Sequence, residues 1–190
     1  MLTEPLDTLP VRIEVTGSDV MTEPAPLTNR PRMFGREPAG RSLPWSWAHD
    51  RLGEARDYWV TTASRSGRPH ARPFWGLWEG LSFEFSTGSR TLANIRTNSQ
   101  VTVHLESGRD VVIVEGDASV ILQPARLQDF VEAYNGKYGG CLEVRGHEVG
   151  DDTFGNGGVV VVRAVVIYGW AQSVETATRW DVTSQTRAQT

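Results

Sequence analysis

The residues best suited to chemistry form one short segment, Ser86-Thr87-Gly88-Ser89-Arg90. The alternating residues before it predict a strand that delivers the two hydroxyls, Gly88 allows a tight turn, and Ser89 can cap a helix that begins at Arg90. Such a helix start presents unpaired N–H groups and a partial positive charge, and arginine adds a charged fork, so the segment suits a phosphate. By itself, however, this pattern is more often an ordinary capped helix with a solvated arginine.

Other patterns of catalytic or metal-binding residues are missing from the sequence. The four histidines have no metal-ligand spacing, Cys141 has no nearby base motif, and no GxSxG, GxGxxG or Walker motif occurs. His104 falls on the polar side of its predicted strand, where an exposed or groove-lining residue is favoured over a proton donor. We therefore predict no catalytic side chain and no metal site, so any redox chemistry would come from a bound cofactor.

The bulk composition excludes several classes of protein. The chain has 190 residues, a net charge of −4, 39% apolar residues and 22% charged residues, as expected of one globular domain. Because no block of lysine and arginine stands out, the composition disfavours nucleic-acid binding. The apolar stretch Val159–Trp170 is interrupted by Arg163 and is too short to span a bilayer, and no signal-peptide pattern opens the chain. We expect a cytoplasmic protein that binds neither nucleic acid nor a membrane.

The elements that must position the segment are predicted from periodicity. Residues 1–44 hold seven of the ten prolines and are predicted to form an extended or disordered arm, whereas residues 45–190 form the folded domain. Within that domain, alternation and turn residues predict strands, and apolar stripes predict helices. The predicted strands cover 58–63, 69–78 (at an edge or bulged, because of its prolines), 81–86, 101–105, 111–114 and 159–170. The predicted helices cover 90–97 and 124–138, residues 45–53 are predicted to form a short helix or a turn, and a glycine-rich loop covers 146–158. These elements indicate a small β-barrel with helical decoration, in which Trp59 lies in the core.

The order of motifs from Trp59 to Gly116 resembles that of a known family. The motifs include Trp-Val-Thr-Thr-Ala, Arg-Pro-His-Ala-Arg-Pro-Phe-Trp-Gly-Leu-Trp, Phe-Ser-Thr-Gly-Ser-Arg-Thr, Asn-Ile-Arg and Val-Val-Ile-Val-Glu-Gly. They resemble the pyridoxamine 5′-phosphate oxidase-like split-barrel superfamily. The ending Thr178-Arg179-Trp180 resembles the flavin/deazaflavin oxidoreductases of that superfamily. The resemblance covers residues 45–182 and implies a mainly β (β+α) fold, an FMN-binding-like split β-barrel with two or three helices.

The resemblance also implies a binding site, carried over by position. It implies a homodimer that holds FMN or the deazaflavin coenzyme F420 in a groove between protomers. The implied phosphate-binding positions are Ser86, Thr87, Arg90 and Thr91, with Asn94 supporting the loop, and the cofactor ring would lie beside the backbone of Pro73, Phe74 and Trp75. The implied residues that close the groove are Trp170, Arg179 and Trp180.

One of these positions departs from the family pattern. Many relatives have a lysine immediately after the arginine, where this chain has Thr91. The substitution removes one phosphate contact, so we expect Arg90 to contribute more to cofactor affinity here than in a relative that keeps both cations.

The implied function is that of an oxidoreductase which transfers hydride to or from a small organic substrate, largely apolar and unsaturated or quinone-like. The Thr-Arg-Trp ending makes coenzyme F420 the first choice of cofactor and FMN the second. The alternative is a non-catalytic protein that binds or carries a flavin, a deazaflavin or haem. A pyridoxamine phosphate oxidase proper is less favoured, because the extended C-terminal substrate-binding motif of that enzyme is not matched.

Overall fold

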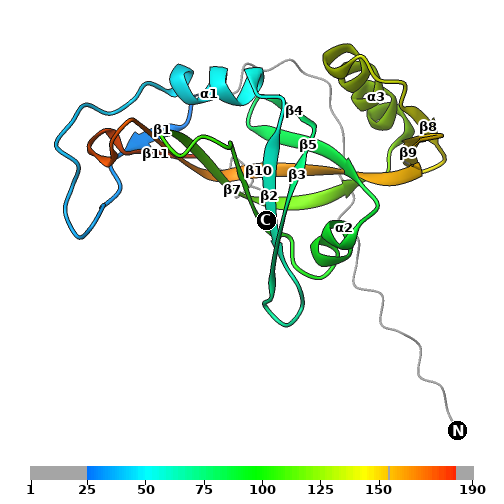
Figure 1. The fold of residues 1–190 in the computed structure, drawn as a ribbon, viewed down its shortest axis with the longest axis horizontal. Helices are drawn as coiled ribbons and strands as arrows, with labels where there is room; N and C mark the ends of the chain where they lie inside the picture. The colour runs from blue at the N-terminus through cyan, green and yellow to red at the C-terminus, as the bar shows by residue number, and fades with distance from the viewer. Residues whose placement is uncertain (1–24, 154, 183–190) are drawn as a thin grey trace, which may run out of the picture.

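The computed structural model describes residues 25–153 and 155–182; the first 24 residues of the predicted arm lie outside the described part. Antiparallel strands dominate the described chain, and three α-helices lie around them (Figure 1). The prediction of a mainly β fold with two or three helices is confirmed, and the arrangement is that of a split barrel.

The strands and helices alternate irregularly along the chain. The strands are β1 (Leu27–Asn29), β2 (Tyr58–Ala63), β3 (Pro69–Phe74), β4 (Gly76–Glu79), β5 (Ser82–Thr87), β6 (Gln100–His104), β7 (Asp110–Ile121), β8 (Glu143–Arg145), β9 (Glu148–Asp151), β10 (Gly155–Ala171) and β11 (Thr178–Asp181). The α-helices are α1 (Trp45–Glu54), α2 (Arg90–Ile95) and α3 (Pro124–Tyr138), and Val174–Thr176 forms a 3-10 turn. Among the described residues, no helix is long and apolar enough to cross a membrane.

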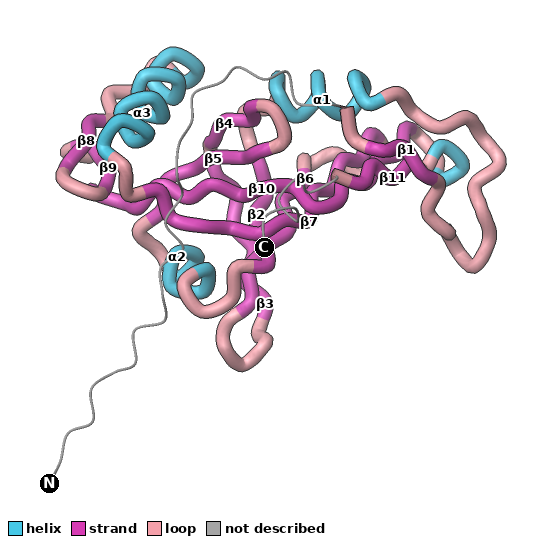
Figure 2. The backbone as a smooth tube through the Cα atoms, turned by 180° about the vertical axis from the view of Figure 1, so that it is seen from behind, coloured by secondary structure: helices cyan, strands magenta, loops and turns pink. Residues whose placement is uncertain are grey.

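Strand β10 joins the two halves of the sheet. One of its edges pairs with β7 along most of its length, with a bulge between Ala164 and Val166. The other edge pairs first with β9, then with β5 and finally with β11. The main strand order is β1-β11-β10-β7-β6-β2-β3, and β4 and β8 extend it through β5 and β9 (Figure 2).

The four consecutive valines of β10, residues 159–162, are explained by burial of the strand on both of its faces. Val160 and Val162 face the barrel interior, whereas Val159 and Val161 pack under α3. A strand covered on both sides has no solvent face that would require polar residues. Helix α3 contributes the predicted apolar stripe, and it ends at Gly139, whose φ of 66° permits the left-handed cap.

Helix α1 packs against β4 and β7. Its Ala48 and Leu52 are fully buried, and Trp45 packs edge-on against Trp180, with 5.8 Å between the ring centroids. Trp180 is itself fully buried, so β11 delivers its largest side chain to the core. Packing of this kind contributes several kcal/mol for each large aromatic side chain, about 3–5 kcal/mol by truncation.

Several segments differ from the sequence-based predictions; β7, for example, covers Asp110–Ile121 where a strand is predicted only over 111–114. The predicted strand 69–78 is two strands separated at Trp75; its first part, β3, lies at an edge of the sheet, as its prolines indicate. Residues 146–158 contain β9 and the start of β10, because the backbone groups of this glycine-rich segment pair with each other. The prediction that Trp59 lies in the core is wrong: its side chain is 36% exposed and stacks on His104 on the outer face of the sheet.

The described end of the proline-rich arm, residues 25–44, is joined to the C-terminal part of the domain. Strand β1 pairs with β11, which makes it the outermost strand on that side. Beyond it, the carboxylate of Glu175 accepts the backbone N–H of Ala39 at 2.7 Å and pairs with Arg36. The arm therefore adds to the sheet and is then held by the Glu175 carboxylate, by the Glu175 carbonyl oxygen, which accepts the Gly40 N–H at 2.9 Å, and by Thr178 Oγ1, which accepts the Leu43 N–H at 2.8 Å.

Candidate functional site

The hydroxyl-rich segment connects β5 to α2 as predicted, but its hydroxyls face different ways. Strand alternation directs Thr87 to the buried face with Phe83 and Phe85, while Ser86 lies half-buried on the other face. The Thr87 hydroxyl lies 2.9 Å from the Ser89 hydroxyl, and Ser89 Oγ accepts the backbone N–H of Thr91 at 3.2 Å. Thr87 and Ser89 therefore fix the loop and cap the helix, which leaves Ser86 as the hydroxyl on the outer side.

A close approach of β10 shapes this loop from behind. A Cβ atom at Gly157 would lie 2.8 Å from the backbone carbon of Thr87 and 2.9 Å from Ser86 Oγ. At Gly88 an added Cβ would lie 2.8 Å from the Asn156 carbonyl oxygen. The two backbones can run this closely together only because both positions are glycine.

Helix α2 is anchored to β2 from its inner side. The Asn94 amide is buried and donates a hydrogen bond to Thr62 Oγ1 at 2.9 Å, which fits the expected role of support for the loop. Thr91 is fully buried, and its hydroxyl has no partner among the described residues. Its side chain therefore faces the interior, against the expectation that position 91 contacts the cofactor.

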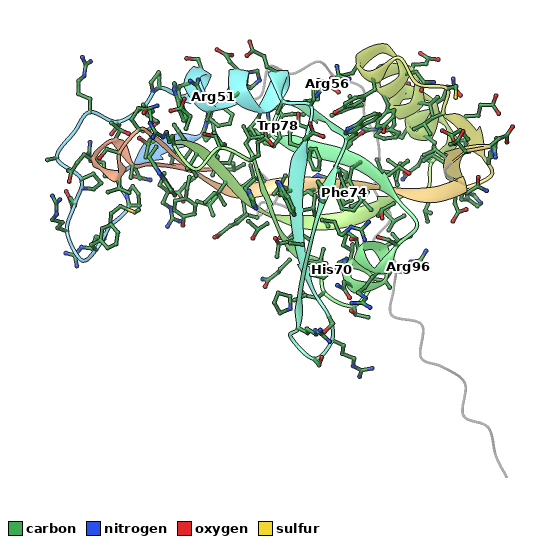
Figure 3. All side chains as sticks on the ribbon, viewed as in Figure 1. Arg51, Arg56, His70, Phe74, Trp78 and Arg96 are labelled. Carbon is green, nitrogen blue, oxygen red and sulfur yellow. The ribbon has the colours of Figure 1, made fainter. Side chains whose placement is uncertain are left out.

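A cavity of about 280 Å³ lies between α2 and the hairpin that joins β2 to β3. Arg68 and His70 line it from the hairpin, and Arg90 and Asn94 line it from the helix. His70 Nε2 is buried and has no hydrogen-bond partner among the described residues, although buried polar atoms are nearly always paired. Figure 3 shows His70 on β3 with α2 beside it. The cavity thus offers two cations and an unused ring nitrogen, and no carboxylate lines it.

The positive character of this region extends well beyond the cavity. Residues 58–78 and 85–105 contain no aspartate or glutamate but carry five arginines. Within the described parts of the chain, none of the five forms an ion pair. These arginines are Arg65, Arg68, Arg72, Arg90 and Arg96. The net charge of −4 does not show that the basic residues are concentrated here, so reasoning from overall charge missed Arg68, Arg72 and His70. The two stretches without aspartate or glutamate were the signal that could have found them.

Strand β3 connects the cavity to an aromatic region. His70, Arg72 and Phe74 pair with residues of β2 that are buried, and by alternation they share one face of the strand. Phe74 is half-buried and packs on Phe85, with 4.8 Å between the ring centroids. His70 and Phe74 are four residues apart, or about 13 Å along a strand. Pro73, on the opposite face, is exposed.

The aromatic region continues at Trp75, which is 49% exposed. Its ring lies flat on that of Tyr138, at the end of α3, with 4.9 Å between centroids, and its Nε1 donates to Asp57 at 3.1 Å. Trp78, on the neighbouring strand β4, is by contrast buried in the barrel core. The last turn of α3 therefore contacts the break between β3 and β4, a contact that sequence spacing does not show.

The residues expected from the C-terminal part do not join the others within one chain. Strand β10 places Gly158 opposite Thr87 but Tyr168 opposite Arg179, and these two points are ten residues, or about 33 Å, apart. Trp170 is half-buried, and Arg179 pairs with Asp181 at 2.6 Å. Trp180 lies fully buried in the core, which leaves it no surface for a cofactor.

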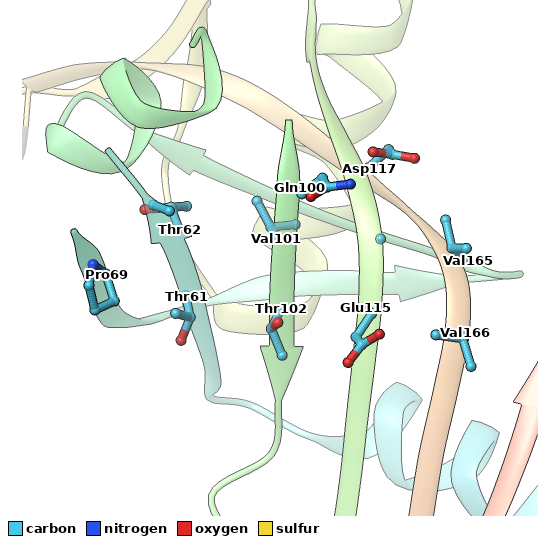
Figure 4. A pocket seen from close by; sticks show the side chains of 12 residues that line it. Thr61, Thr62, Pro69, Gln100, Val101, Thr102, Glu115, Asp117, Val165 and Val166 are labelled. Carbon is cyan, nitrogen blue, oxygen red and sulfur yellow. The ribbon is translucent and has the colours of Figure 1, made fainter. Parts of the chain in front are cut away.

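A second cavity, of about 410 Å³, lies on the outer face of the sheet formed by β2, β6, β7 and β10 (Figure 4). Its lining includes two carboxylates, Glu115 and Asp117, together with threonines and valines. Negative charge in the wall opposes an anionic ligand, so the phosphate-binding prediction fits the smaller, basic cavity better.

Comparison with known proteins agrees with this fold. A model of the family described as pyridoxamine 5′-phosphate oxidase matches residues 48–175. The chain belongs to that family. Among solved structures, the same family fold is seen in a conserved hypothetical protein from Mycobacterium tuberculosis, with a TM-score of 0.57 and 18% identity over 77% of this chain and 96% of that one.

Two further solved structures have a fold similar to that of this chain. General stress protein 26 of Bacillus anthracis strain Sterne gives a TM-score of 0.53 and 17% identity over 72% of this chain and 97% of that one. HupZ of Group A Streptococcus gives 0.52 and 16% identity over 74% of this chain and 100% of that one. No significant match is found among curated proteins. At these identities the likeness is one of fold.

Proposed function

We propose that this chain binds the phosphate of coenzyme F420, or of FMN as second choice, in the basic cavity between α2 and the β2–β3 hairpin. The observation that carries the proposal is the unpartnered Nε2 of His70, buried beside Arg68 and Arg90. An anion there would receive charge-assisted hydrogen bonds from both guanidinium groups and would give the histidine its missing partner. Ser86 supplies a further hydroxyl from the neighbouring loop.

Arg72 joins this set through the face that it shares with His70 on β3. It offers a cation from the sheet side, whereas Arg90 offers one from the helix. Thr91 stands where many relatives have a lysine, and its buried side chain has no access to the ligand. In this proposal Arg72 supplies the positive charge that the lysine would have supplied. Thr87 and Ser89 act on the loop, and Asn94, which lines the cavity, uses its amide group to hold α2 to β2.

The cofactor ring lies along β3 in this proposal. A phosphate beside His70 places the ring about 13 Å away, next to the backbone of Pro73, Phe74 and Trp75. Trp170 and Arg179 are too far from the cavity to act on the same cofactor within one chain, so they close the groove only from a second copy, which makes the working unit a homodimer. Trp180 supports β11 from the core.

The bound cofactor supplies the hydride chemistry, and the residues of this chain bind and orient it. Arg68, Arg72 and Arg90 hold its charged end, and Phe74 and Trp75 border the ring and exclude water from one side. The enzyme is accordingly an oxidoreductase acting on a small organic substrate. The Thr178-Arg179-Trp180 ending favours coenzyme F420.

A titration of the purified chain with F420, FMN and riboflavin tests this function. We expect F420 or FMN to bind with micromolar affinity or better, and riboflavin, which lacks the phosphate, to bind at least tenfold more weakly. Arg90→Ala should weaken binding of the phosphorylated cofactor by about 10- to 100-fold, since charge-assisted hydrogen bonds contribute about 1.5–3 kcal/mol. Arg96→Ala is the matched control, because Arg96 is an arginine at the other end of α2 that does not line the cavity. Equal losses in both variants, or no binding of either cofactor, would refute the proposal.

The alternative, a non-catalytic haem-binding protein, is favoured by one specific observation. His104 Nδ1 donates to the carbonyl oxygen of Leu105 at 2.8 Å, which leaves Nε2 with its lone pair, as in histidines that ligate metals. Trp59 stacks beside it with 4° between the ring planes. Addition of haemin should then give a Soret band that His104→Ala shifts or removes, while His147→Ala leaves it unchanged. Identical spectra in all three proteins would exclude this role for His104.

A further inference from the structure

The turn at the tip of the described arm holds an aromatic side chain in an unfavourable backbone conformation. Met33 and Arg36 form a β-bridge, and the two residues between them, Phe34 and Gly35, have φ angles of 52° and 80°. Glycine adopts such angles freely, and asparagine or aspartate is the usual alternative at the first of these two positions. A phenylalanine there is disfavoured by its own Cβ atom. The local backbone therefore gives no reason for an aromatic residue at position 34.

Phe34 gains little from packing within the described part of the chain. It is 88% exposed, and the loop that carries it projects beyond the sheet in both views of the backbone (Figures 1 and 2). Arg30 nevertheless holds the base of the loop by donating to the Gly40 carbonyl oxygen at 2.6 Å. At the tip, the Met33 N–H donates to the Arg36 carbonyl oxygen at 2.8 Å. An exposed aromatic side chain on a fixed loop is typical of residues that anchor protein–protein contacts, because little conformational entropy is lost when it is buried.

The loop around Phe34 is positively charged. Residues 30–41 contain four arginines and one acidic residue, Glu37. Arg32 and Arg41 are exposed and form no ion pair among the described residues. A surface that receives this loop should therefore combine apolar contact for the ring with negative charge around it.

The larger cavity, on the outer face of the sheet, has both properties. In its wall, Glu115 and Asp117 of β7 lie beside Val165 and Val166 of β10 (Figure 4). Val165 is 51% exposed and so offers apolar surface. The cavity has a volume of about 410 Å³. A cavity of about 150 Å³ holds a benzene ring, so this one has room for a phenylalanine ring and part of the chain beside it.

We propose that the loop at residues 30–41 of one copy of the chain inserts Phe34 into this cavity of a second copy. Burial of the ring in the second copy offsets the unfavourable backbone of the turn, and Arg32 and Arg41 bring positive charge to the carboxylates of Glu115 and Asp117. The inference goes beyond the proposed function, because the basic cavity at α2 would bind its phosphate whether or not the loops are exchanged.

The position of the arm on the sheet is compatible with this exchange. Leu27 of β1, which is 60% exposed, pairs with Asp181, and Asp181 pairs with Val166 of the cavity wall. Side chains that pair in this way share one face of a sheet, so the exposed side chain of β1 lies on the face that contains the cavity. A two-fold axis that runs between two such faces, parallel to the strands, places β1 of one copy opposite β2 of the other. Each copy then gives one loop and receives one.

Photocrosslinking of the full chain, without added cofactor, tests the insertion directly. The photoreactive residue p-benzoylphenylalanine in place of Phe34 keeps an aromatic ring at the tip and reacts under ultraviolet light with the C–H bonds that it touches. We expect a covalent product of two chains, in which position 34 is joined to residues 100–102, 115–117 or 165–166. The same photoreactive residue at Leu122, which is 40% exposed and does not line the cavity, is the matched control and should not join to these segments.

Sedimentation equilibrium measures what the ring and the charges contribute. Phe34→Gly removes the ring and suits the positive φ, so the turn and the thermal stability of the chain should be retained. We expect the dissociation constant of the dimer to rise about tenfold or more in Phe34→Gly, since anchor residues carry most of the energy of an interface. Glu115→Gln combined with Asp117→Asn should also raise it.

Control variants remove matched groups elsewhere on the surface. Leu122→Ala, and Asp129→Asn combined with Glu132→Gln on α3, should leave the dissociation constant unchanged, because none of these residues lines the cavity.

Four results would overturn the proposal. They are a chain that stays monomeric at all concentrations, an unchanged dissociation constant in Phe34→Gly, an equal rise in the control variants, and crosslinks from position 34 to other segments only. Binding to phosphatidylglycerol vesicles that Phe34→Gly abolishes while the dimer persists would assign the ring to a membrane contact and would also overturn it. Because these assays contain no cofactor, failure of the F420 and FMN titrations leaves the result independent.

Discussion

The rings of Trp75 and Tyr138 are parallel to within 1°, and the hydroxyl of the same tyrosine binds the next residue, Gly76. One side chain at the end of α3 therefore fixes both an exposed ring and the backbone beside it. This contact joins the helix to the point where one predicted strand divides into β3 and β4. It links the packing of α3 to the geometry of the proposed ring site.

Tyr138→Phe separates these two effects. The variant keeps the stacked ring but leaves the buried Gly76 N–H without its acceptor, so we expect the free energy of unfolding to fall by about 1–3 kcal/mol. Urea denaturation measures this loss. Tyr134→Phe on the same helix is the control. If Tyr134→Phe lowers the free energy of unfolding as much as Tyr138→Phe does, the role assigned to the Tyr138 hydroxyl is contradicted.

Acid should release the part of the arm held by Glu175. Hydrogen bonds from the Ala39 N–H and, second, from Arg36 hold the pKa of Glu175 below its ordinary value. Because the pKa of Glu175 is lower in the folded protein than in the unfolded chain, its ionised carboxylate stabilises the folded state at pH values above the ordinary carboxyl pKa of about 4.3. This stabilisation is lost as the pH falls through the lower pKa of the folded state. Hydrogen exchange of residues 36–40, corrected for intrinsic rates, should show less protection near pH 3 than near pH 6, values on either side of about 4.3. In Glu175→Gln, protection should be weak at both pH values; full protection there would refute the prediction.

Trp180 should contribute to the stability of the fold and should make no contact with a ligand. Truncation to alanine removes a fully buried indole from the core and should cost about 3–5 kcal/mol of unfolding free energy. Trp170→Ala, at a half-buried position on the adjacent strand, should cost clearly less. Thermal unfolding of the two variants gives the comparison. A small effect of Trp180→Ala would mean that the indole does not pack as the structure shows.

Gly157 is expected to be intolerant of even a methyl group. In Gly157→Ala the new Cβ would meet the backbone of Thr87 at 2.8 Å, so the loop before α2 must move, at a cost of about 1–3 kcal/mol. Gly53→Ala gives the opposite sign: nothing lies within 4 Å of its added Cβ, and alanine in a helix should stabilise by up to about 1 kcal/mol. Denaturation midpoints measure both changes. A neutral Gly157→Ala would show that the close approach of β10 is not required.

Local signals predicted much of the fold. Helix α3 follows directly from Pro124 in its first turn, the stripe Leu127, Phe130 and Val131, and the Gly139 cap. Strand β2 matches its alternating pattern, and Ser89 caps α2 as its residue type indicates. Each of these features depends on neighbours within one or two turns of chain, which the sequence contains in full.

Features set by distant partners could not be predicted in the same way. The break at Trp75 depends on Tyr138, which is 63 residues away by number. The burial of Trp180 and Thr91 depends on what covers β11 and α2, and the exposure of Trp59 depends on which face of β2 the barrel uses. For the candidate site, the loop at residues 86–90 was visible in the sequence, but the contribution of Arg68 and His70 required the hairpin to fold back beside α2.

The position of β10 after its partners β5, β7 and β9 in the sequence has a consequence for synthesis. Strands β5, β7, β9 and β11 all need it as a partner, so none of them has its full set of backbone hydrogen bonds until residues 155–171 have been made. The pairing of β5 with β10, which brings Thr87 opposite Gly158, spans a long loop and is slow, because that loop must close first. On the ribosome, the first 150 residues would therefore leave the exit tunnel with unpaired strand edges, and the domain can close only after β10 has been made.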